Sequence, residues 1–252
     1  MRKAQFFYLL RRGLLSGGLN FITEGLVMAS KFITQGLSFP AQGSASFDGA
    51  SDYIQLNTPF SYTNHTIAAW VYLDNVLTAG KTVFDNRDAN DDGIRLIQSG
   101  TLFFYQLNSH DRTATLSAKE WYFVVATYDG SDANLYVDGS LESSNATSQT
   151  ISTTTDARIG LSAFEVSGQM NGNLANVAIW NRALSSDEIN SVMWKSYDGL
   201  TPSETSGLQA WYSLDDITSP AASLANMEQL AADKDATIEN KAAITAAINA
   251  LS

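Results

Sequence analysis

The feature that most constrains this chain is a series of short apolar runs separated by turn dipeptides. Residues 120–141 read EWYFVVATYDGSDANLYVDGSL, with Asp-Gly pairs at 129–130 and 138–139. Asp-Gly between two alternating runs is a strong signal for a tight turn between antiparallel strands. The segment is therefore predicted to form antiparallel strands joined by such turns.

Similar runs follow one another from residue 44 to about residue 216. The others are SASFDGASDYIQL, HTIAAWVYLD, KTVFDN, GIRLIQSGTLFFYQL, DARIGL, GNLANVAIW and LQAWYSLDD. This pattern predicts an all-β antiparallel sandwich or barrel of about twelve strands, and two packed sheets suit that number. A single helix is predicted where Ser185-Ser-Asp-Glu188 forms a capping box.

The run WYFVVA, residues 121–126, is apolar at both alternating sets of positions. Apolar side chains on both faces predict a strand in the centre of a sheet. Trp70, Trp121 and Trp180 are accordingly expected to pack in the interior. Stacking of these rings on a sugar is the alternative, and it requires exposure.

The sequence divides into an arm of residues 1–43, a β-rich body of residues 44–216 and an Ala-rich segment of residues 217–252. The Ala-rich segment has no glycine or proline after Pro220 and is predicted to form one helix or a helix pair. Its apolar seam is expected either to pack on the sandwich or to pair with copies of itself in a homo-oligomer.

The arm combines positive charge with apolar residues. Residues 1–40 carry five basic residues against Glu24 alone, a net charge of +4 in a chain whose formal net charge is −11. An imperfect repeat, FITEGL and FITQGL, begins at Phe21 and Phe32. The arm is interpreted either as paired or wrapped extended segments or as an anchor into a larger assembly. The anchoring residues would be Arg2, Lys3, Arg11, Arg12, Phe21 and Phe32.

Composition excludes several classes of function. The negative charge makes nonspecific nucleic-acid binding by the main body unfavourable, and the absence of cysteine excludes thiol chemistry. No apolar stretch reaches the roughly 18 residues that span a bilayer, so no membrane span is expected. Arg11 and Arg12 interrupt the first apolar run, which makes it a poor signal peptide.

An acidic segment contains the opening half of a calcium loop. Asp88, Asn90 and Asp92, followed by Gly93, match the pattern D-x-[DN]-x-[DN]-G. An EF-hand is excluded because its twelfth position is Ser99 and because strands flank the segment. The segment is interpreted either as a solvated hairpin rim or as a ligand site. The rim-loop candidates for a ligand are Asp85, Asp88, Asn90 and Asp92.

Four blocks of the sequence resemble the laminin-G-like, concanavalin A-like jelly-roll superfamily. They are SASFDGASDYIQL, HTIAAWVYLD, EWYFVVATYDGSDANLYVDGSL and NGNLANVAIWNRALSSDEI, and the last is similar to the signature G-x-I-D-E-V-R-I-W-N-R-A-L-S. The resemblance covers about residues 44–195 and implies a jelly-roll sandwich, a fold that serves lectins, adhesion modules, hydrolases and structural spacers.

The resemblance also bears on calcium. Many members of the superfamily bind a structural calcium through the Asp of that signature, but Ala175 and then Asn176 occupy the matching positions here. A methyl group cannot coordinate a cation that takes six to eight oxygens, so no cofactor is required. A calcium site elsewhere is the alternative, with Asp48, Asp52, Asp88 and Asp92 as its candidate ligands.

No catalytic residue is predicted. Hydrolases of the superfamily commonly use a carboxylate motif, E-x-D-x-x-E, which this sequence lacks, as it lacks G-x-S-x-G. His65 and His110 are the only histidines, and both are expected to be solvated or hydrogen-bonded residues at strand ends. The protein is therefore not expected to be an enzyme.

These observations predict a structural or adhesion protein of a virion, as a capsid decoration or tail component of a bacteriophage. The arm would bind other virion proteins, and the sandwich would bind surface glycans. Assembly would take place in the host cytoplasm. The alternative is an extracellular bacterial carbohydrate-binding module, with or without calcium.

Overall fold

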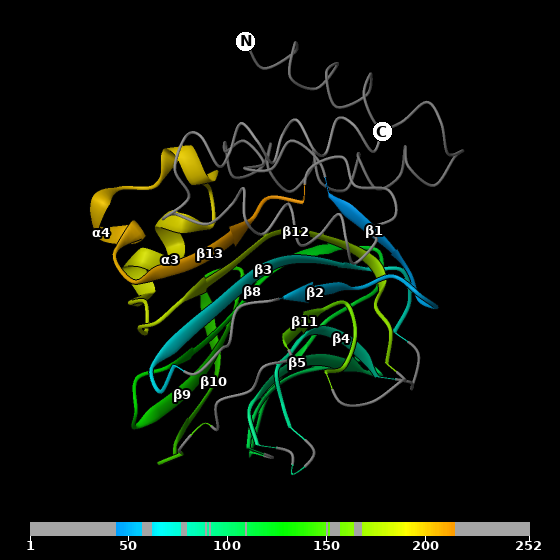
Figure 1. Ribbon diagram of the computed structural model, residues 1–252, viewed down its shortest axis with the longest axis horizontal. Coiled ribbons are helices and arrows are strands. Elements are labelled where there is room, and N and C mark those ends of the chain that lie inside the picture. Colours follow the sequence, from blue (N-terminus) through cyan, green and yellow to red (C-terminus); the bar gives the residue numbers. More distant parts are fainter. Residues whose placement is uncertain are drawn as a thin grey trace.

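The computed structural model describes residues 44–56, 62–76, 80–88, 90, 92–108, 110–149, 151, 157–163 and 168–214. Within these residues, thirteen strands form two antiparallel sheets packed face to face, with short helices outside one of them (Figure 1). The predicted two-sheet architecture is confirmed, with one strand more than the estimate. The predictions for the arm and for the Ala-rich segment 217–252 fall on residues outside those described.

The larger sheet, sheet A, has the strand order β1-β12-β3-β8-β9-β10, and β13 also pairs with β12. Its strands are β1 (Ala45–Asp48), β3 (His65–Leu73), β8 (Trp121–Tyr128), β9 (Asp132–Val137), β10 (Ser140–Ala146), β12 (Asn171–Trp180) and β13 (Leu208–Tyr212). The two predicted Asp-Gly turns connect β8 to β9 and β9 to β10. In the second turn Asp138 and Gly139 both have positive φ, 50° and 82°, as a tight hairpin turn requires.

The smaller sheet, sheet B, has the strand order β2-β11-β4-β5-β6-β7. Its strands are β2 (Ile54–Leu56), β4 (Lys81–Asp85), β5 (Ile94–Ser99), β6 (Leu102–Leu107), β7 (His110–Thr115) and β11 (Ala157–Ile159). A bulge in β4 between Thr82 and Phe84 shifts its register against β5. As a result Asp85 pairs with Arg95 on the outer side of the sheet.

The space between the sheets is an apolar core to which both sheets contribute, with Ile67 of β3 and Phe84 of β4 fully buried. Burial of an aliphatic or aromatic side chain of this size contributes about 1.5–3 kcal/mol each. The central strand β8 carries apolar side chains on both of its faces, as predicted. Val124 and Ala126 face this core, and Phe123 faces the opposite side of the sheet.

The opposite face of sheet A carries a second apolar layer, which includes all five tryptophans of the chain. They are Trp70, Trp121, Trp180, Trp194 and Trp211. The first three are at most 5% exposed, so the prediction of interior packing is confirmed for them. Trp180 and Trp211 meet edge to face with their ring centroids 6.3 Å apart.

Three short helices cover this second layer: α3 (Ser186–Val192), η1 (Tyr197–Gly199) and α4 (Pro202–Thr205). The predicted capping box begins α3, since the hydroxyl of Ser185 accepts from the Glu188 N–H and the Glu188 carboxylate accepts from the Ser185 N–H. A second capping box from Thr201 to Glu204 begins α4. The prediction of a single helix within residues 44–216 is therefore wrong. None of the helices in the described residues is long and apolar enough to cross a membrane.

One end of the core is closed by buried polar side chains. His65, at the start of β3, is fully buried, and its Nε2 lies 2.8 Å from the hydroxyl of Tyr105. Arg112 is 1% exposed and donates to three backbone carbonyls, on β7, β9 and β10, at 2.9, 3.3 and 3.1 Å. Its guanidinium thereby connects the edge of sheet B to the edge of sheet A. His65 is thus a hydrogen-bonded residue at a strand end, and His110, at the start of β7, is exposed, as expected.

Candidate functional site

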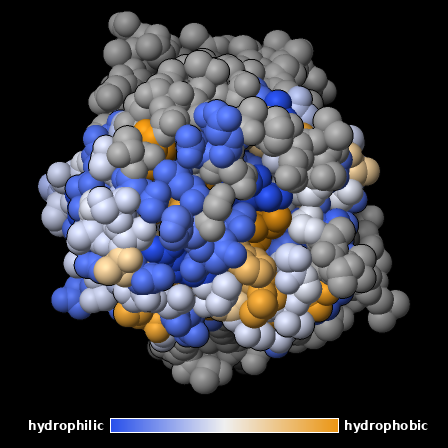
Figure 2. All heavy atoms as spheres, turned by 90° about the horizontal axis from the view of Figure 1, so that it is seen from below, coloured by the Kyte–Doolittle hydropathy of each residue, from blue (hydrophilic) through white to orange (hydrophobic). Residues whose placement is uncertain are grey.

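The two outer faces of the sandwich differ in what covers them. The outer face of sheet A lies beneath α3, η1 and α4 and their connecting segments. The outer face of sheet B lies on the other side of the molecule, below β4 and β5 in Figure 1. Seen from that side, hydrophilic residues gather at the centre of the surface, with smaller apolar areas beside them (Figure 2). We therefore describe the outer face of sheet B as the candidate site.

Strand pairing places one continuous row of polar side chains across all six strands of sheet B. Alternation along each strand puts these side chains on the face opposite the core. The row consists of Gln55, Arg158, Asp85, Arg95, Gln106 and Asp111. A neighbouring row on the same face consists of Thr82, Ile97, Phe104 and Thr113.

Asp85 anchors the buried half of the polar row. Its carboxylate accepts from the Nε and Nη2 of Arg87, at 3.1 and 3.0 Å, and from the hydroxyl of Ser162 at 2.9 Å. The Nε of Arg95 lies 3.7 Å from the same carboxylate. Asp85 is fully buried. Its prediction as a rim-loop residue is wrong, because pairing with Arg95 and Arg158 holds it within β4.

Arg158 continues the row towards β2. Its Nε donates to the Gln55 amide oxygen at 3.0 Å, and its Nη1 donates to the Ser162 carbonyl at 2.9 Å. The guanidinium also lies over the ring of Tyr53, 5.4 Å from its centroid. These contacts fix the direction of the side chain, so this half of the face is rigid and polar.

The half formed by β6 and β7 is open. Phe104 is half-buried, and Leu102, next along the face of β6, is 40% exposed. Beside Phe104, the Gln106 amide donates to the Asp111 carboxylate at 2.8 Å, and Thr113 lies directly opposite Phe104 on β7. The open half thus combines an aromatic ring with an amide, a carboxylate and a hydroxyl.

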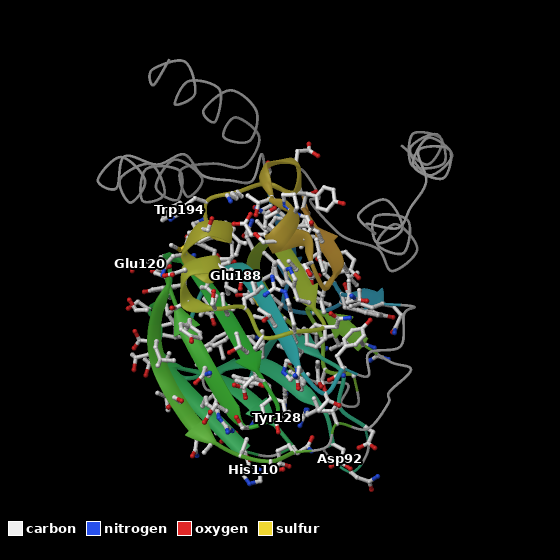
Figure 3. All side chains as sticks on the ribbon, turned by 90° about the vertical axis from the view of Figure 1, so that its left-hand side faces the viewer. Asp92, His110, Glu120, Tyr128, Glu188 and Trp194 are labelled. Atoms are coloured by element: carbon white, nitrogen blue, oxygen red, sulfur yellow. The ribbon has the colours of Figure 1, made fainter. Side chains whose placement is uncertain are left out.

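The acidic loop between β4 and β5 folds around Asp88. One oxygen of the Asp88 carboxylate accepts from the backbone N–H groups of Asn90 and Asp92, at 2.8 and 3.1 Å. These bonds, that from Asn90 above all, lower the pKa of Asp88. Figure 3 shows Asp92 and His110 at the same end of the sandwich, the end away from Trp194. The three predicted loop residues therefore lie together at a rim, where Asp88 holds the turn.

Asp48 stabilises the turn between β1 and β2 through similar hydrogen bonds. Its carboxylate accepts from the N–H groups of Ala50 and Ser51, at 2.8 and 2.9 Å. Hydrogen bonds from the backbone of Ser51 and Ala50 lower the pKa of Asp48 to about 2. Asp52 accepts from the Asp48 N–H at 3.1 Å. The four predicted calcium ligands thus divide between two different turns.

Every carboxyl group with a shifted pKa in the described residues has its pKa lowered. They are Asp48, Asp88, Asp129, Glu188 and Glu204. A general acid needs the opposite, a pKa raised towards neutrality. Hydrogen bonds from Arg182 lower the pKa of Glu188 to about 2, which suits a helix cap and an ion pair. None of these five groups can therefore donate a proton at neutral pH.

A family model described as the concanavalin A-like lectin/glucanases superfamily matches residues 48–190, more than half of the chain. The chain belongs to the concanavalin A-like lectin/glucanases superfamily. Membership confirms the predicted jelly-roll sandwich. No curated protein matches the sequence.

The solved structures that are similar to this chain are distant from it in sequence. A Bacteroides ovatus protein provisionally described as carbohydrate binding has a TM-score of 0.57 and 17% identity, over 70% of this chain and 52% of that one. The chain therefore spans about half of that relative. The botulinum neurotoxin type G receptor-binding domain has a TM-score of 0.45 and 18% identity, over 60% of this chain and 46% of the domain. At 17% identity the likeness to the Bacteroides ovatus protein shows the fold alone.

Within this superfamily, the position expected to hold a calcium-binding Asp is fully apolar here. Ala175 is completely buried in the layer outside sheet A, and Asn176 is 3% exposed in a bulge of β12. Among the described residues, no group of three acidic or histidine side chains is arranged to hold a metal ion. Calcium binding at the two Asp turns stays a prediction.

Sequence reasoning missed the polar row on sheet B. Alternation in β5 and β6 marks Arg95 and Gln106 as outward-facing, which was the available signal. The partners of the row come from distant positions, however, such as Gln55 and Arg158, which are 103 residues apart. Only the strand order brings them together.

Proposed function

We propose that this protein is a non-catalytic glycan-binding module whose ligand lies on the open half of the outer face of sheet B. One observation carries the proposal, which is the juxtaposition of the Phe104 ring with the hydrogen-bonded pair Gln106 and Asp111. The superfamily and the fold shared with the Bacteroides ovatus protein support it.

The chemistry of this surface suits a sugar. A pyranose has an apolar face of C–H groups and an equatorial rim of hydroxyls, so it needs a flat apolar contact and polar groups around it. The Phe104 ring supplies the contact. The Asp111 carboxylate accepts from hydroxyls, and the Gln106 amide can both donate and accept. The bond between these two side chains holds them in place before binding, which reduces the entropy lost on association.

The absence of catalysis is part of the proposal. Cleavage of a glycosidic bond requires a carboxylic acid that is protonated near neutral pH beside a second carboxylate. In the described residues, the five carboxyl groups with shifted pKa values are all more acidic than isolated carboxyls, so they are ionised near neutral pH. Asp85, the acid at the centre of the face, is occupied by Arg87 and Ser162.

A glycan array probed with the full chain tests the proposal, followed by titration calorimetry with the best ligand. Phe104→Ala is expected to weaken binding about tenfold, equivalent to about 1.4 kcal/mol. Leu141→Ala is the matched control, because Leu141 is 53% exposed on β10 of sheet A. Equal affinity of both variants and the wild type, or no glycan bound at all, would refute the proposed site.

We further propose that the module is displayed on a virion, as a capsid decoration or tail component. Its support is the basic, apolar arm of residues 1–43 predicted from the sequence. A bacterial carbohydrate-binding module assisted by calcium is the second candidate. Antibodies raised against the chain separate the two locations. Labelling of purified virus particles would support display on a virion, and labelling of bacterial surfaces would support the second candidate. Array binding that disappears with a chelator would favour the second candidate.

A further inference from the structure

One guanidinium on the outer face of sheet B has no carboxylate partner. The carboxylate of Asp85 lies 3.0 Å from the Nη2 of Arg87 and 3.7 Å from the Nε of Arg95, so these two cations share it. Arg158 is opposite Asp85 in the pairing of β11 with β4, yet in the described part of the chain no carboxylate lies within ion-pair distance of its guanidinium. This face therefore holds an uncompensated positive charge in a chain whose net charge is −11.

The neutral partners of Arg158 hold its guanidinium in one place. The Gln55 amide oxygen and the Ser162 carbonyl accept from its Nε and Nη1, and the guanidinium lies over the ring of Tyr53. Gln55 is fixed in turn, because its amide nitrogen donates to two backbone carbonyls, at 3.4 and 3.3 Å. The Nη2 of Arg158 has no partner among the residues that the structure describes. Donors are therefore left over on a side chain whose direction is already set.

These side chains are accessible to a ligand. Tyr53, Gln55 and Arg158 are half-buried, whereas Asp85, next along the polar row, is fully buried. Figure 2 shows this side of the molecule, with hydrophilic residues at its centre. The strand β11, which carries Arg158, and the strand β6, which carries Phe104, are three strands apart in sheet B, roughly 14 Å. The face thus has two accessible parts, one aromatic and one cationic.

A fixed guanidinium with unused donors is suited to an oxyanion. Its planar N–H groups match the oxygens of a carboxylate or a sulfate, with which they form charge-assisted hydrogen bonds. The hydroxyls of a neutral sugar can accept from the same donors but do not balance the charge. Because the guanidinium of Arg158 is held in place before binding, little further side-chain entropy is lost on association.

We propose that Arg158 and Tyr53 form a subsite for the carboxylate or sulfate group of an acidic glycan. The proposal rests on the glycan-binding function inferred above, and it adds a charged subsite to the ring-stacking one at Phe104. A glycan that reaches both parts of the face spans roughly 14 Å across the strands, so its ligand is an acidic oligosaccharide rather than a monosaccharide.

Two pairs of polysaccharides test the subsite by affinity electrophoresis of the full chain. Polygalacturonate is compared with its carboxyl-reduced form, and dextran sulfate is compared with dextran. We expect the acidic member of at least one pair to bind about tenfold more tightly than the neutral member at low salt. This preference should weaken in about 0.3 M NaCl, because salt screens the charges. The pair that shows the preference distinguishes a carboxylate ligand from a sulfate ligand.

Substitutions then locate the preference on the molecule. Arg158→Gln is expected to remove it and to leave the affinity for the neutral member unchanged. Arg158→Lys keeps the charge without the planar donors and is expected to retain only part of the preference. Lys119→Gln is the matched control, because it removes the same charge from an exposed side chain outside sheet B. Urea unfolding verifies that each variant is folded.

The outcomes separate this proposal from the glycan-binding site at Phe104. Equal affinity for both members of each pair, or equal effects of Arg158→Gln and Lys119→Gln, would overturn the subsite and leave binding at Phe104 standing. Binding of none of the four polysaccharides would overturn the subsite as well. A preference that survives Phe104→Ala but not Arg158→Gln would support the subsite and refute the stacking site.

Discussion

Lowering the pH from 7.5 to 5.0 is expected to destabilise the sandwich through a single residue, His65. This side chain is fully buried, beside Tyr105 and Tyr128 and in the same polar cluster as Arg112. Burial lowers the pKa of His65 from 6.5 to about 4, although hydrogen bonds with the backbone of Thr63 and Tyr62 act in the opposite direction. His65 is therefore neutral in the folded chain at pH 5, whereas it is mostly protonated in the unfolded chain.

The sign and size of the effect follow from this difference in pKa. On acidification, His65 binds a proton in the unfolded state before it does so in the folded state. Its contribution to the free energy of unfolding is therefore complete above about pH 6.5 and is lost as the pH falls towards 4. The full loss is about 3 kcal/mol, of which about 2 kcal/mol is lost by pH 5.0. The carboxyl groups with pKa values near 2 keep almost all of their stabilising contribution at pH 5.0 and lose it only as the pH falls further towards 2.

Urea unfolding followed by circular dichroism at pH 7.5 and 5.0 measures the loss. His65→Gln retains a hydrogen-bonding group near Tyr105 and has no charge to gain, so its stability should fall about 2 kcal/mol less than that of the wild type. His110→Gln is the matched control, since His110 is the other histidine and is exposed. A His65→Gln variant that loses as much stability as the wild type would refute this reasoning.

Three further substitutions test the packing. Asp85→Asn leaves the buried guanidinium of Arg87 without its carboxylate and should cost about 3–5 kcal/mol in urea unfolding, so a loss below 1 kcal/mol would argue against the buried ion pair. Arg112→Met leaves the backbone carbonyls of His110, Ala133 and Asn145 without this donor and should lower the unfolding free energy by about 1–3 kcal/mol, which thermal unfolding would detect. Ser185→Ala removes the cap of α3 and should cost about 1 kcal/mol by the same assay, while an unchanged melting temperature would show that the cap is dispensable.

Much of the fold is predictable because its signals are local. The turn at Asp138 and Gly139 and the two apolar faces of β8 can be read from adjacent residues. The cap at Ser185 is equally local. The capping box from Thr201 to Glu204 could also have been recognised in the sequence. It was missed because α4 has only four residues and lacks the apolar run that marks a longer helix.

The candidate site is less predictable because it depends on strand order and register. Asp85 stands in an acidic stretch and resembles a loop residue in sequence, yet the bulge in β4 and pairing across sheet B bury it. Phe104 and Gln106 are recognisable as outward-facing on β6, but their neighbours on the face are set by pairing with β5 and β7. Registers of this kind are not encoded in any single segment.

The placement of the tryptophans has a practical consequence. All five lie in the layer outside sheet A, and the core and sheet B separate them from the Phe104 face. Because the sheets of a sandwich are about 10 Å apart, an indole on the far layer does not sense a molecule bound to the other side. Intrinsic emission should thus stay constant when a ligand occupies sheet B and shift when a partner docks on the helical side. The unlabelled protein can report in this way which of its two faces has been engaged.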